Sequence, residues 1–234
     1  AIQTYVGRHQ KDTGRISLQR CEEINATFGW DIDANDGQPL VQLSHWCAFS
    51  PVVSTDELGI DGHPHKGRFL PDLGLERRMW ASGSLEFLKP LHVNETLTRS
   101  ATIEKIDEKG GRMAFVTVSH EIHGENGVAI RESQNIVYLA MPEKFDPPAK
   151  RPIPEKLVFE NRLEMPSTRL FRFSAITFNA HRIHYDLPYA QDVERYPGLV
   201  VHGPLQAMFL AKAASEYAKT ELRSFQFRGI HPSF

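Results

Sequence analysis

The sequence predicts an α+β fold built in two halves, and three observations support this prediction. Four segments between residues 82 and 139 are rich in β-branched and aromatic residues and are separated by turn clusters, as expected for neighbouring strands. Residues 205–218 are mostly apolar and contain no glycine or proline, which favours a buried helix. Between them, residues 141–156 contain five prolines, which favours an extended linker.

The composition is that of an ordinary globular protein. The chain has 234 residues, of which 41% are hydrophobic and 24% charged, and its formal net charge is −2. Such a chain lacks the basic excess of general nucleic-acid or membrane-surface binders, so we expect neither kind of partner. The two cysteines, Cys21 and Cys47, are too few for a disulfide framework or a zinc site.

The N-terminus and the hydropathy predict a cytoplasmic protein. No apolar run approaches the length needed to cross a membrane, and the first residues lack the charged-then-apolar pattern of a signal peptide. Because the chain begins with Ala1 rather than Met, a removed targeting segment stays open. A eukaryotic protein that had lost such a segment would be mitochondrial.

The first half begins with helical and loop patterns. Apolar residues three and four apart favour a helix through residues 18–28. The apolar residues 39–49 suggest a second, short helix packed under a sheet. Residues 55–71 are rich in glycine, proline and aspartate, which predicts a long loop, and long ordered loops are often functional.

Four consecutive strands are expected after this loop. Glycine-containing clusters at residues 108–111 and 124–127 mark two of the turns between them. Because the connections are short, the strands are expected to form an antiparallel meander. The expected strands are residues 82–88, 97–106, 113–122 and 128–139.

The second half is predicted to be shorter than the first. Residues 157–166 and 169–173 suggest a strand and a lead-in, and residues 224–227 begin another strand after the helix. A second half that copied the first would need three further strands. We therefore expect either a truncated chain or a partner chain that completes the sheet, since an open sheet edge must be covered.

The stretch 171–203 concentrates polar and aromatic residues, among them three histidines, and leads into the predicted helix. His181 and His184 are three residues apart, which places both on one face of a helical turn. Histidine is the side chain best suited to move protons near neutral pH. Gly203 and Pro204 are typical of a helix start, where free backbone N–H groups can hold an oxyanion.

These motifs resemble those of the MaoC-like family of (R)-specific enoyl-CoA hydratases and dehydratases, which have a hot-dog fold. The family fingerprint Asp-x-Asn-Pro-(Ile/Leu)-His is similar to residues 179–184, Asn-Ala-His-Arg-Ile-His, and its later Val-His-Gly is similar to residues 201–203. One branch has two hot-dog domains and resembles this chain also at residues 62–64, 69–71 and 77–80. That branch includes mesaconyl-C4-CoA hydratases, itaconyl-CoA hydratases and 3-hydroxyacyl-thioester dehydratases.

The resemblance implies a double hot-dog, in which an antiparallel sheet wraps a central helix in each of two repeats, the second incomplete at the C-terminus. It implies an N-terminal domain, residues 1–140, which is degenerate and serves structure or substrate binding. A linker, residues 141–156, joins it to a C-terminal domain, residues 157–234, which carries the catalytic motif. We also expect a homo-oligomer, most simply a dimer.

The chain departs from the fingerprint at two positions. The catalytic aspartate of the family is Asn179 here, and its asparagine is His181. A neutral amide neither gains nor loses a proton in the working range, so Asn179 cannot serve as a general base. Proton transfer then falls to His184, His181 or both. Asp186 is expected to cap local structure rather than orient His184, because residues two apart on a helix do not face each other.

The leading hypothesis is a hydro-lyase that reversibly hydrates an α,β-unsaturated acyl-CoA. His184 is expected to activate the water, with His181 or Asn179 positioning it. The Gly203 backbone N–H would hold the thioester oxygen. The resemblance implies a short acyl group, branched or dicarboxylic, as in mesaconyl-C4-CoA or itaconyl-CoA, although fatty 3-hydroxyacyl thioesters stay open.

Candidate substrate-binding residues come from both halves. Arg77 and Arg78 suit the phosphates of coenzyme A, because guanidinium binds phosphate well, but an exposed basic pair would give the same pattern. Arg172 is an alternative to Arg182 as the partner of a distal carboxylate. The candidates are Tyr185, His202, Arg77, Arg78 and Arg182.

No metal or cofactor is expected. His63 and His65 suggest a metal site, but the sequence shows no third ligand near them. No nucleotide redox motif or phosphate loop is present, so the only carrier implied is the coenzyme A of the thioester substrate.

Two rival functions use the same fold. A hot-dog thioesterase would hydrolyse the thioester, usually with a carboxylate base, and no Asp or Glu stands at the start of this motif. A non-catalytic acyl-thioester-binding subunit would bind acyl-CoA and leave it unchanged, with Asn179 as the mark of lost chemistry.

Overall fold

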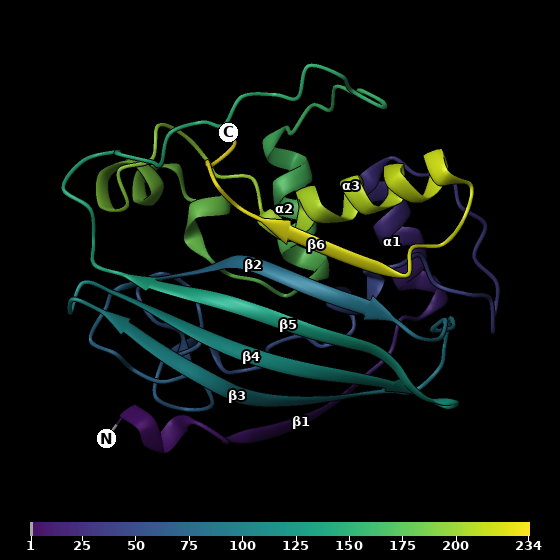
Figure 1. Ribbon diagram of the computed structural model, residues 1–234, viewed down its shortest axis with the longest axis horizontal. Coiled ribbons are helices and arrows are strands. Elements are labelled where there is room, and N and C mark those ends of the chain that lie inside the picture. The colour runs from purple at the N-terminus through teal and green to yellow at the C-terminus, as the bar shows by residue number, and fades with distance from the viewer. Residues whose placement is uncertain (1) are drawn as a thin grey trace.

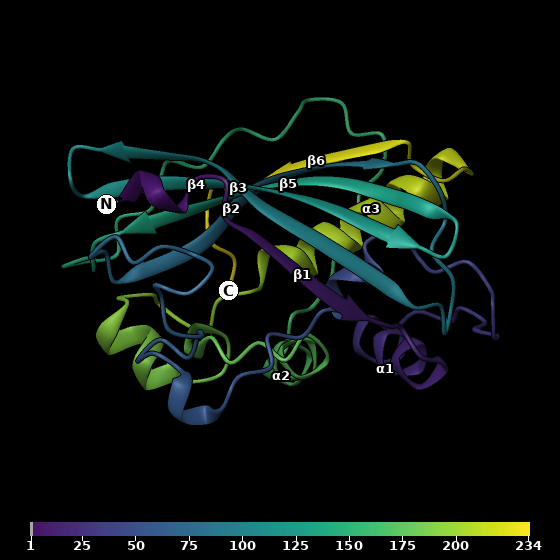
Figure 2. The ribbon, with the colours of Figure 1, turned by 90° about the horizontal axis from the view of Figure 1, so that it is seen from below.

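A computed structural model of the chain describes residues 2–234, and its centre is one antiparallel sheet of six strands. The strand order is β1-β3-β4-β5-β2-β6, and the helices gather on one side of the sheet (Figures 1 and 2). The strands are β1 His9–Gly14, β2 Arg77–Phe87, β3 Leu97–Lys109, β4 Met113–Gly124, β5 Gly127–Leu139 and β6 Ser224–Arg228.

The four strands predicted for the first half are present, but the predicted meander is only partly correct. Strands β3, β4 and β5 follow one another across the sheet, whereas β2 pairs with β5 on the far side. The link between β2 and β3, residues 88–96, therefore crosses about three strand spacings, or roughly 14 Å, which nine extended residues easily span. A short link in the sequence did not require adjacent strands.

The strand predicted to begin near residue 224 is β6, and it joins the sheet of the first half. It pairs antiparallel with β2, with Gly83 opposite Phe227. A Cβ on Gly83 would lie 2.7 Å from the Phe227 ring, so only glycine leaves room for that ring. Trp46 and Trp80 pack edge-on against Phe227, with ring centroids 5.8 and 5.4 Å away. Aromatic side chains of the first half, Trp46 and Trp80, thus pack against Phe227 of the second half.

Three α-helices lie over the sheet: α1 Leu18–Phe28, α2 Ser167–Ile176 and α3 Gly203–Ala218. The helix predicted at residues 18–28 is confirmed as α1, which Ser17 caps by accepting a hydrogen bond from the Arg20 N–H. Gly29 ends it in the left-handed conformation, with φ of 72°. The predicted last helix is confirmed as α3, with Pro204 in its first turn.

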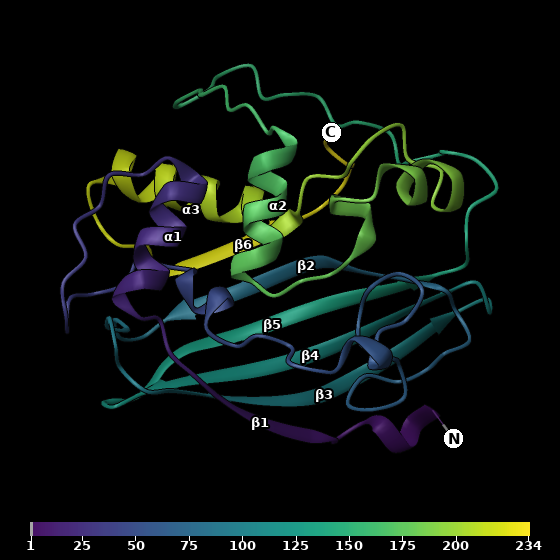
Figure 3. The same ribbon diagram turned by 180° about the vertical axis from the view of Figure 1, so that it is seen from behind.

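Helix α2 corrects the sequence prediction for this region. Residues 169–173 were expected to be a lead-in to the motif, but they lie in α2, where Leu170 and Phe173 face the core at helical spacing. Residues 157–166 form no regular element and pass over the outside of the helices (Figure 3). The short helix predicted within residues 39–49 is one 3₁₀ turn, Ser44–Cys47.

The core joins residues of both halves. Phe28 of α1 contacts Phe209 of α3 and Phe173 of α2, with ring centroids 4.8 and 5.9 Å away. Leu205 and Met208 of α3 are fully buried within the same cluster. The division into domains 1–140 and 157–234 stays a prediction. Within residues 2–234, the helices are all too short or too polar to cross a membrane.

Because Leu205 is fully buried, Leu205→Ala is expected to lower the free energy of unfolding by about 2–5 kcal/mol. The matched control is Leu210→Ala on the same helix, whose side chain is 56% exposed and whose loss should cost within about 0.5 kcal/mol. Urea unfolding followed by circular dichroism measures both. Equal losses would contradict this assignment of the buried face of α3.

Candidate functional site

The motif 179–184 forms a tight turn after the end of α2. The backbone N–H of Asn179 donates to the Ser174 carbonyl, and its side-chain oxygen accepts from the His181 N–H at 3.0 Å. Residues Arg182–His184 then form one 3₁₀ turn. The side chain of Asn179 thus serves as a local cap, a role that an amide oxygen fills without any charge.

His184 is held in one orientation by backbone. Its Nδ1 donates to the Val200 carbonyl at 2.6 Å, which leaves Nε2 unprotonated in the neutral ring and able to accept a proton. The ring stacks on His202 with centroids 3.6 Å apart. His202, at the start of α3, bonds the Ser174 hydroxyl through Nε2 at 2.8 Å, and its Nδ1 has no partner within the described residues. Both histidines are buried.

His181 lies against a buried carboxylate. Its Nε2 is 3.5 Å from Glu194, which is 2% exposed and also binds Arg77 at 3.1 Å and the Tyr189 hydroxyl at 3.2 Å. Arg77 therefore lies behind His181. Arg78 is 9% exposed and donates to a backbone carbonyl of the 55–71 loop. The alternative of an exposed basic pair is wrong, and phosphate binding by these arginines stays a prediction.

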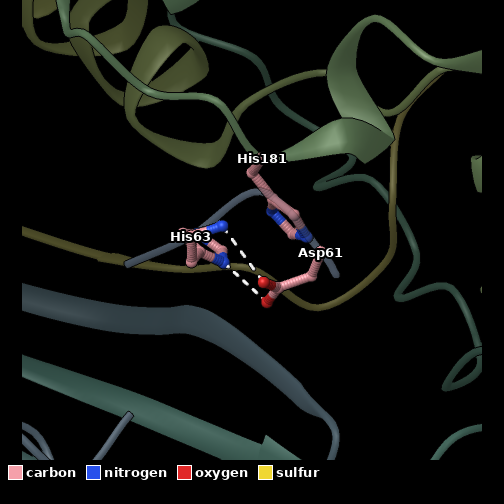
Figure 4. A group of neighbouring side chains, drawn as sticks. All are labelled: Asp61, His63 and His181. Atoms are coloured by element: carbon pink, nitrogen blue, oxygen red, sulfur yellow. Dashed lines mark hydrogen bonds and ion pairs between the residues drawn. The ribbon is translucent and has the colours of Figure 1, made fainter. Parts of the chain in front are cut away.

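The long loop predicted at residues 55–71 brings Asp61 and His63 to the motif (Figure 4). Asp61 accepts two hydrogen bonds from His63, at 2.9 Å from ring Nδ1 and at 3.0 Å from the backbone N–H. The His63 ring lies 4.1 Å from the His181 ring. The four rings His63, His181, His184 and His202 thus form a row, with centroid steps of 4.1, 5.3 and 3.6 Å.

The loop fits the motif through a glycine. Gly62 has φ of +88°, and a Cβ built on it would lie 1.8 Å from the Ala180 carbonyl oxygen. The Arg182 N–H donates to the Asp61 carbonyl at 2.8 Å, and the Arg182 guanidinium donates to the Ile60 carbonyl at 3.0 Å. The sequence pointed to a functional loop but not to Asp61, because only the fold places this carboxylate beside His181.

The pKa values favour neutral histidines. Burial, with His202 and His181 nearby, holds the pKa of His184 well below its usual value. Burial and His181 lower the pKa of His202 to about 3, and burial and His181 lower that of His63 to about 4 despite Asp61. Burial alone would raise the pKa of Asp61, but the hydrogen bonds and charge of His63 bring it below its ordinary value. At neutral pH the site therefore contains an ionised carboxylate and proton-accepting rings.

The remaining candidates lie around this row. Tyr185 is 48% exposed and donates to the Ala180 carbonyl, and with Arg172 it lines an open cavity of about 650 Å³ beside α2. Asp186 pairs with Arg182 at 2.8 Å and accepts from the N–H of the following helical turn, so it caps local structure as the sequence indicated. A Cβ on Gly203 would meet no atom within 4 Å, so there is open space beside the first residue of α3.

Asp61, His63 and His181 also have the residue types of a metal site. One ligand atom from each lies within 4.8 Å of the others, so the fold supplies the third ligand that the sequence lacked beside His63. His65 is exposed and is not part of this group. Both oxygens of Asp61 already accept hydrogen bonds from His63, and the geometry is that of a carboxylate–imidazole pair.

Comparisons with known proteins agree with the fold and with the motif. A family described as "Hydroxyacyl-thioester dehydratase type 2" matches residues 43–234. A mesaconyl-C(4)-CoA hydratase from Chloroflexus aurantiacus is 42% identical over 235 residues, which covers 98% of this chain and 84% of that protein. A MaoC-like dehydratase from Phytophthora capsici has a similar structure, with a TM-score of 0.70 at 15% identity over 97% of this chain and 82% of its own.

A further solved structure bears on the number of repeats. A protein from Mycobacterium tuberculosis that is described as a double hot-dog is similar with a TM-score of 0.51, at 14% identity over 97% of this chain and 80% of its own. At this identity the likeness concerns the fold alone. It confirms the α+β, double hot-dog class that the motifs predicted.

Gly62→Ala is expected to destabilise the protein more than Gly74→Ala. Both glycines have positive φ, which costs an alanine about 1–2 kcal/mol, but only at Gly62 would the Cβ meet backbone. We expect Gly62→Ala to lose about 1–3 kcal/mol more, as in overpacked sites. Urea unfolding of the two variants measures the difference. Equal losses would show that the loop does not press on Ala180 in solution.

The free energy of unfolding is expected to fall as the pH is lowered from about 6.5 to about 4.5. The pKa values of His63, His120 and His202 are about 4, 4 and 3 in the folded protein, against about 6.5 when unfolded. In this window the unfolded chain binds more protons, so stability present above pH 6.5 is lost on acidification. Carboxylates with lowered pKa values lose their contribution only below about pH 4.

His202→Gln provides the matched test of this pH dependence. Removing one histidine with a depressed pKa should reduce the slope of unfolding free energy against pH by up to about 1.4 kcal/mol per pH unit. Urea unfolding at several pH values gives the slope, whatever the variant's absolute stability. An unchanged slope would mean that His202 is not held neutral.

Proposed function

Since the chain belongs to the hydroxyacyl-thioester dehydratase type 2 family, and is an acyl-CoA hydro-lyase of the hydratase and dehydratase type, we propose that its substrate is mesaconyl-C4-CoA. The relative from Chloroflexus aurantiacus, which is named a mesaconyl-C(4)-CoA hydratase, supports this choice of substrate. The observation that carries the proposed mechanism is the orientation of His184. Its Nδ1 is bound to a backbone carbonyl, so its Nε2 is available as a base.

In the proposed reaction, water adds at Cβ and a proton is delivered to Cα. His184 Nε2 accepts a proton as the O–H bond of water breaks and the oxygen bonds to Cβ. The π electrons move toward the thioester, and the Gly203 N–H at the start of α3 stabilises the resulting enolate oxygen. The protonated histidine then returns the proton to Cα, so that atoms and charge balance.

His181 and Asn179 have narrower roles in this proposal. The side-chain oxygen of Asn179 accepts the His181 N–H, which leaves one lone pair of that oxygen and the amide NH₂ able to contact water. His181 lies between His63 and His184 and is anchored by Glu194. This position suits it to hold the water in place, while His184 accepts the proton. His202 supports His184 by stacking on it.

The acyl carboxylate is proposed to meet Arg172 in preference to Arg182. Arg182 is already paired with Asp186, and its guanidinium lies 4.2 Å from the centre of the Tyr189 ring. Arg172 lies on the cavity beside α2 with Tyr185 and has no carboxylate partner within the described residues. A carboxylate that entered this cavity could form a bidentate pair with it.

Three sequence expectations about the protein stay proposals. We propose that the chain forms a homodimer and acts in the cytoplasm, with no cofactor beyond the coenzyme A of its substrate. Light scattering on the purified chain tests the first of these, because a dimer has twice the mass of 26.6 kDa calculated for one chain. Itaconyl-CoA and fatty enoyl-CoA are the alternative substrates, and each is compared with mesaconyl-C4-CoA in a hydration assay.

His184→Gln is expected to lower kcat on mesaconyl-C4-CoA by about 10²–10⁴-fold, the usual contribution of a general base. Loss of enoyl absorbance measures hydration, and released thiol measured in parallel reports any hydrolysis. His9→Gln, on the exposed face of β1, serves as the matched control and should keep full activity. Near-normal turnover by a folded His184→Gln variant would rule out this mechanism.

A further inference from the structure

The proposed mechanism creates a positive charge where the protein disfavours one. When His184 accepts the water proton, an imidazolium forms in a buried row of imidazole rings. Burial and the neighbouring His202 and His181 both act against that charge. The family fingerprint has an aspartate beside this histidine, but here the position is Asn179, which carries no charge.

Three carboxylates lie near the row, and two of them are already compensated. Glu194 is paired with Arg77 at 3.1 Å, and Asp186 is paired with Arg182 at 2.8 Å. Asp61 differs from both, because within residues 2–234 its ion-pair partner is His63 and no lysine or arginine. Of the three carboxylates, Asp61 is therefore the one that no arginine pairs with and neutralises directly.

The position of this charge is fixed by close packing. Asp61 holds the His63 ring by a 2.9 Å hydrogen bond, and that ring contacts His181 at 4.1 Å. The contact of Gly62 with Ala180 keeps the loop on the motif. The Asp61 side chain is only 10% exposed, so water screens its field weakly. Figure 4 shows the carboxylate and both rings facing one another.

We propose that Asp61 and His63 are positioning residues of the hydratase site, and that Asp61 supplies the negative charge that Asn179 lacks. Asp61 holds His63 in place. Its negative charge stabilises the imidazolium that forms when His184 accepts the proton of water. Asp61 acts through its charge and not through a hydrogen bond to the base, because its hydrogen bond is to His63 and His181 lies between His63 and His184. This inference rests on the proposed function, and it assigns part of the catalytic machinery to the first half of the chain.

The test compares Asp61→Asn and His63→Gln with His65→Gln on mesaconyl-C4-CoA. The first two variants are expected to lower kcat by at least about 10-fold with KM changed by less than about threefold, because transition-state charge is affected more than binding. His65 is exposed on the same loop, so His65→Gln should match the wild type. Wild-type kcat in folded Asp61→Asn and His63→Gln would overturn the proposal.

A rescue experiment separates charge from structure. Asn179→Asp keeps the side-chain oxygen that caps His181 and returns a carboxylate to the fingerprint position. In the Asp61→Asn background it should recover at least about tenfold of the lost kcat. If Asp61 only held the loop, a change at residue 179 would recover nothing, and the proposal would fail.

Two further outcomes are distinguished in the same assay. If the wild-type chain hydrates none of the enoyl-CoA substrates, the proposed function fails, whereas an active wild type with unaffected Asp61→Asn defeats only this inference.

Wild-type activity is expected to survive EDTA. Its loss in EDTA and return with Zn²⁺ would make Asp61, His63 and His181 metal ligands and would overturn the proposal.

Discussion

A backbone hydrogen bond of 2.8 Å, from the Arg182 N–H to the Asp61 carbonyl, joins the two halves of the chain at the site. Beside it the loop and the motif approach so closely that residue 62 can carry no side chain. This contact is made between backbone groups, so its geometry is rigid and tolerates little adjustment. It holds Asp61 and His63 beside His181, at one end of the row of histidines.

Local sequence patterns predicted the elements that local interactions form. Strand segments were found because alternation and turn residues act over a few positions, and α1 was found because its apolar residues lie three and four positions apart. The place of β2 beside β5 and β6 depends on contacts far apart in the chain, and the sequence missed it. Helix α2 was missed, and its Phe173 packs against Phe28 of α1, a contact between distant residues that the local sequence does not show.

The same distinction applies to the site. His181, His184 and His202 were predicted together because the motif is local, and the structure brings their rings together. Asp61 and His63 lie more than a hundred residues earlier, and no spacing rule links them to His181. The signals that were present were weaker: a long loop rich in glycine, and a likeness to the two-domain branch at residues 62–64, neither of which indicates that His63 contacts His181.

The substitution at residue 179 changes charge and leaves the local geometry of the motif. Either an amide or a carboxylate oxygen can accept the His181 N–H, so the turn survives both residues. In the proposed arrangement the negative charge lies on a loop of the other half, on Asp61, whose partner His63 contacts the His181 ring. In this proposal the base His184 and the oxyanion donor Gly203 belong to the second half, and the carboxylate Asp61 that stabilises the positive charge belongs to the first. In this proposal catalysis depends on the packing of the two halves against each other, because a movement of Gly62 away from Ala180 would also remove the Asp61 carboxylate from the row of histidines.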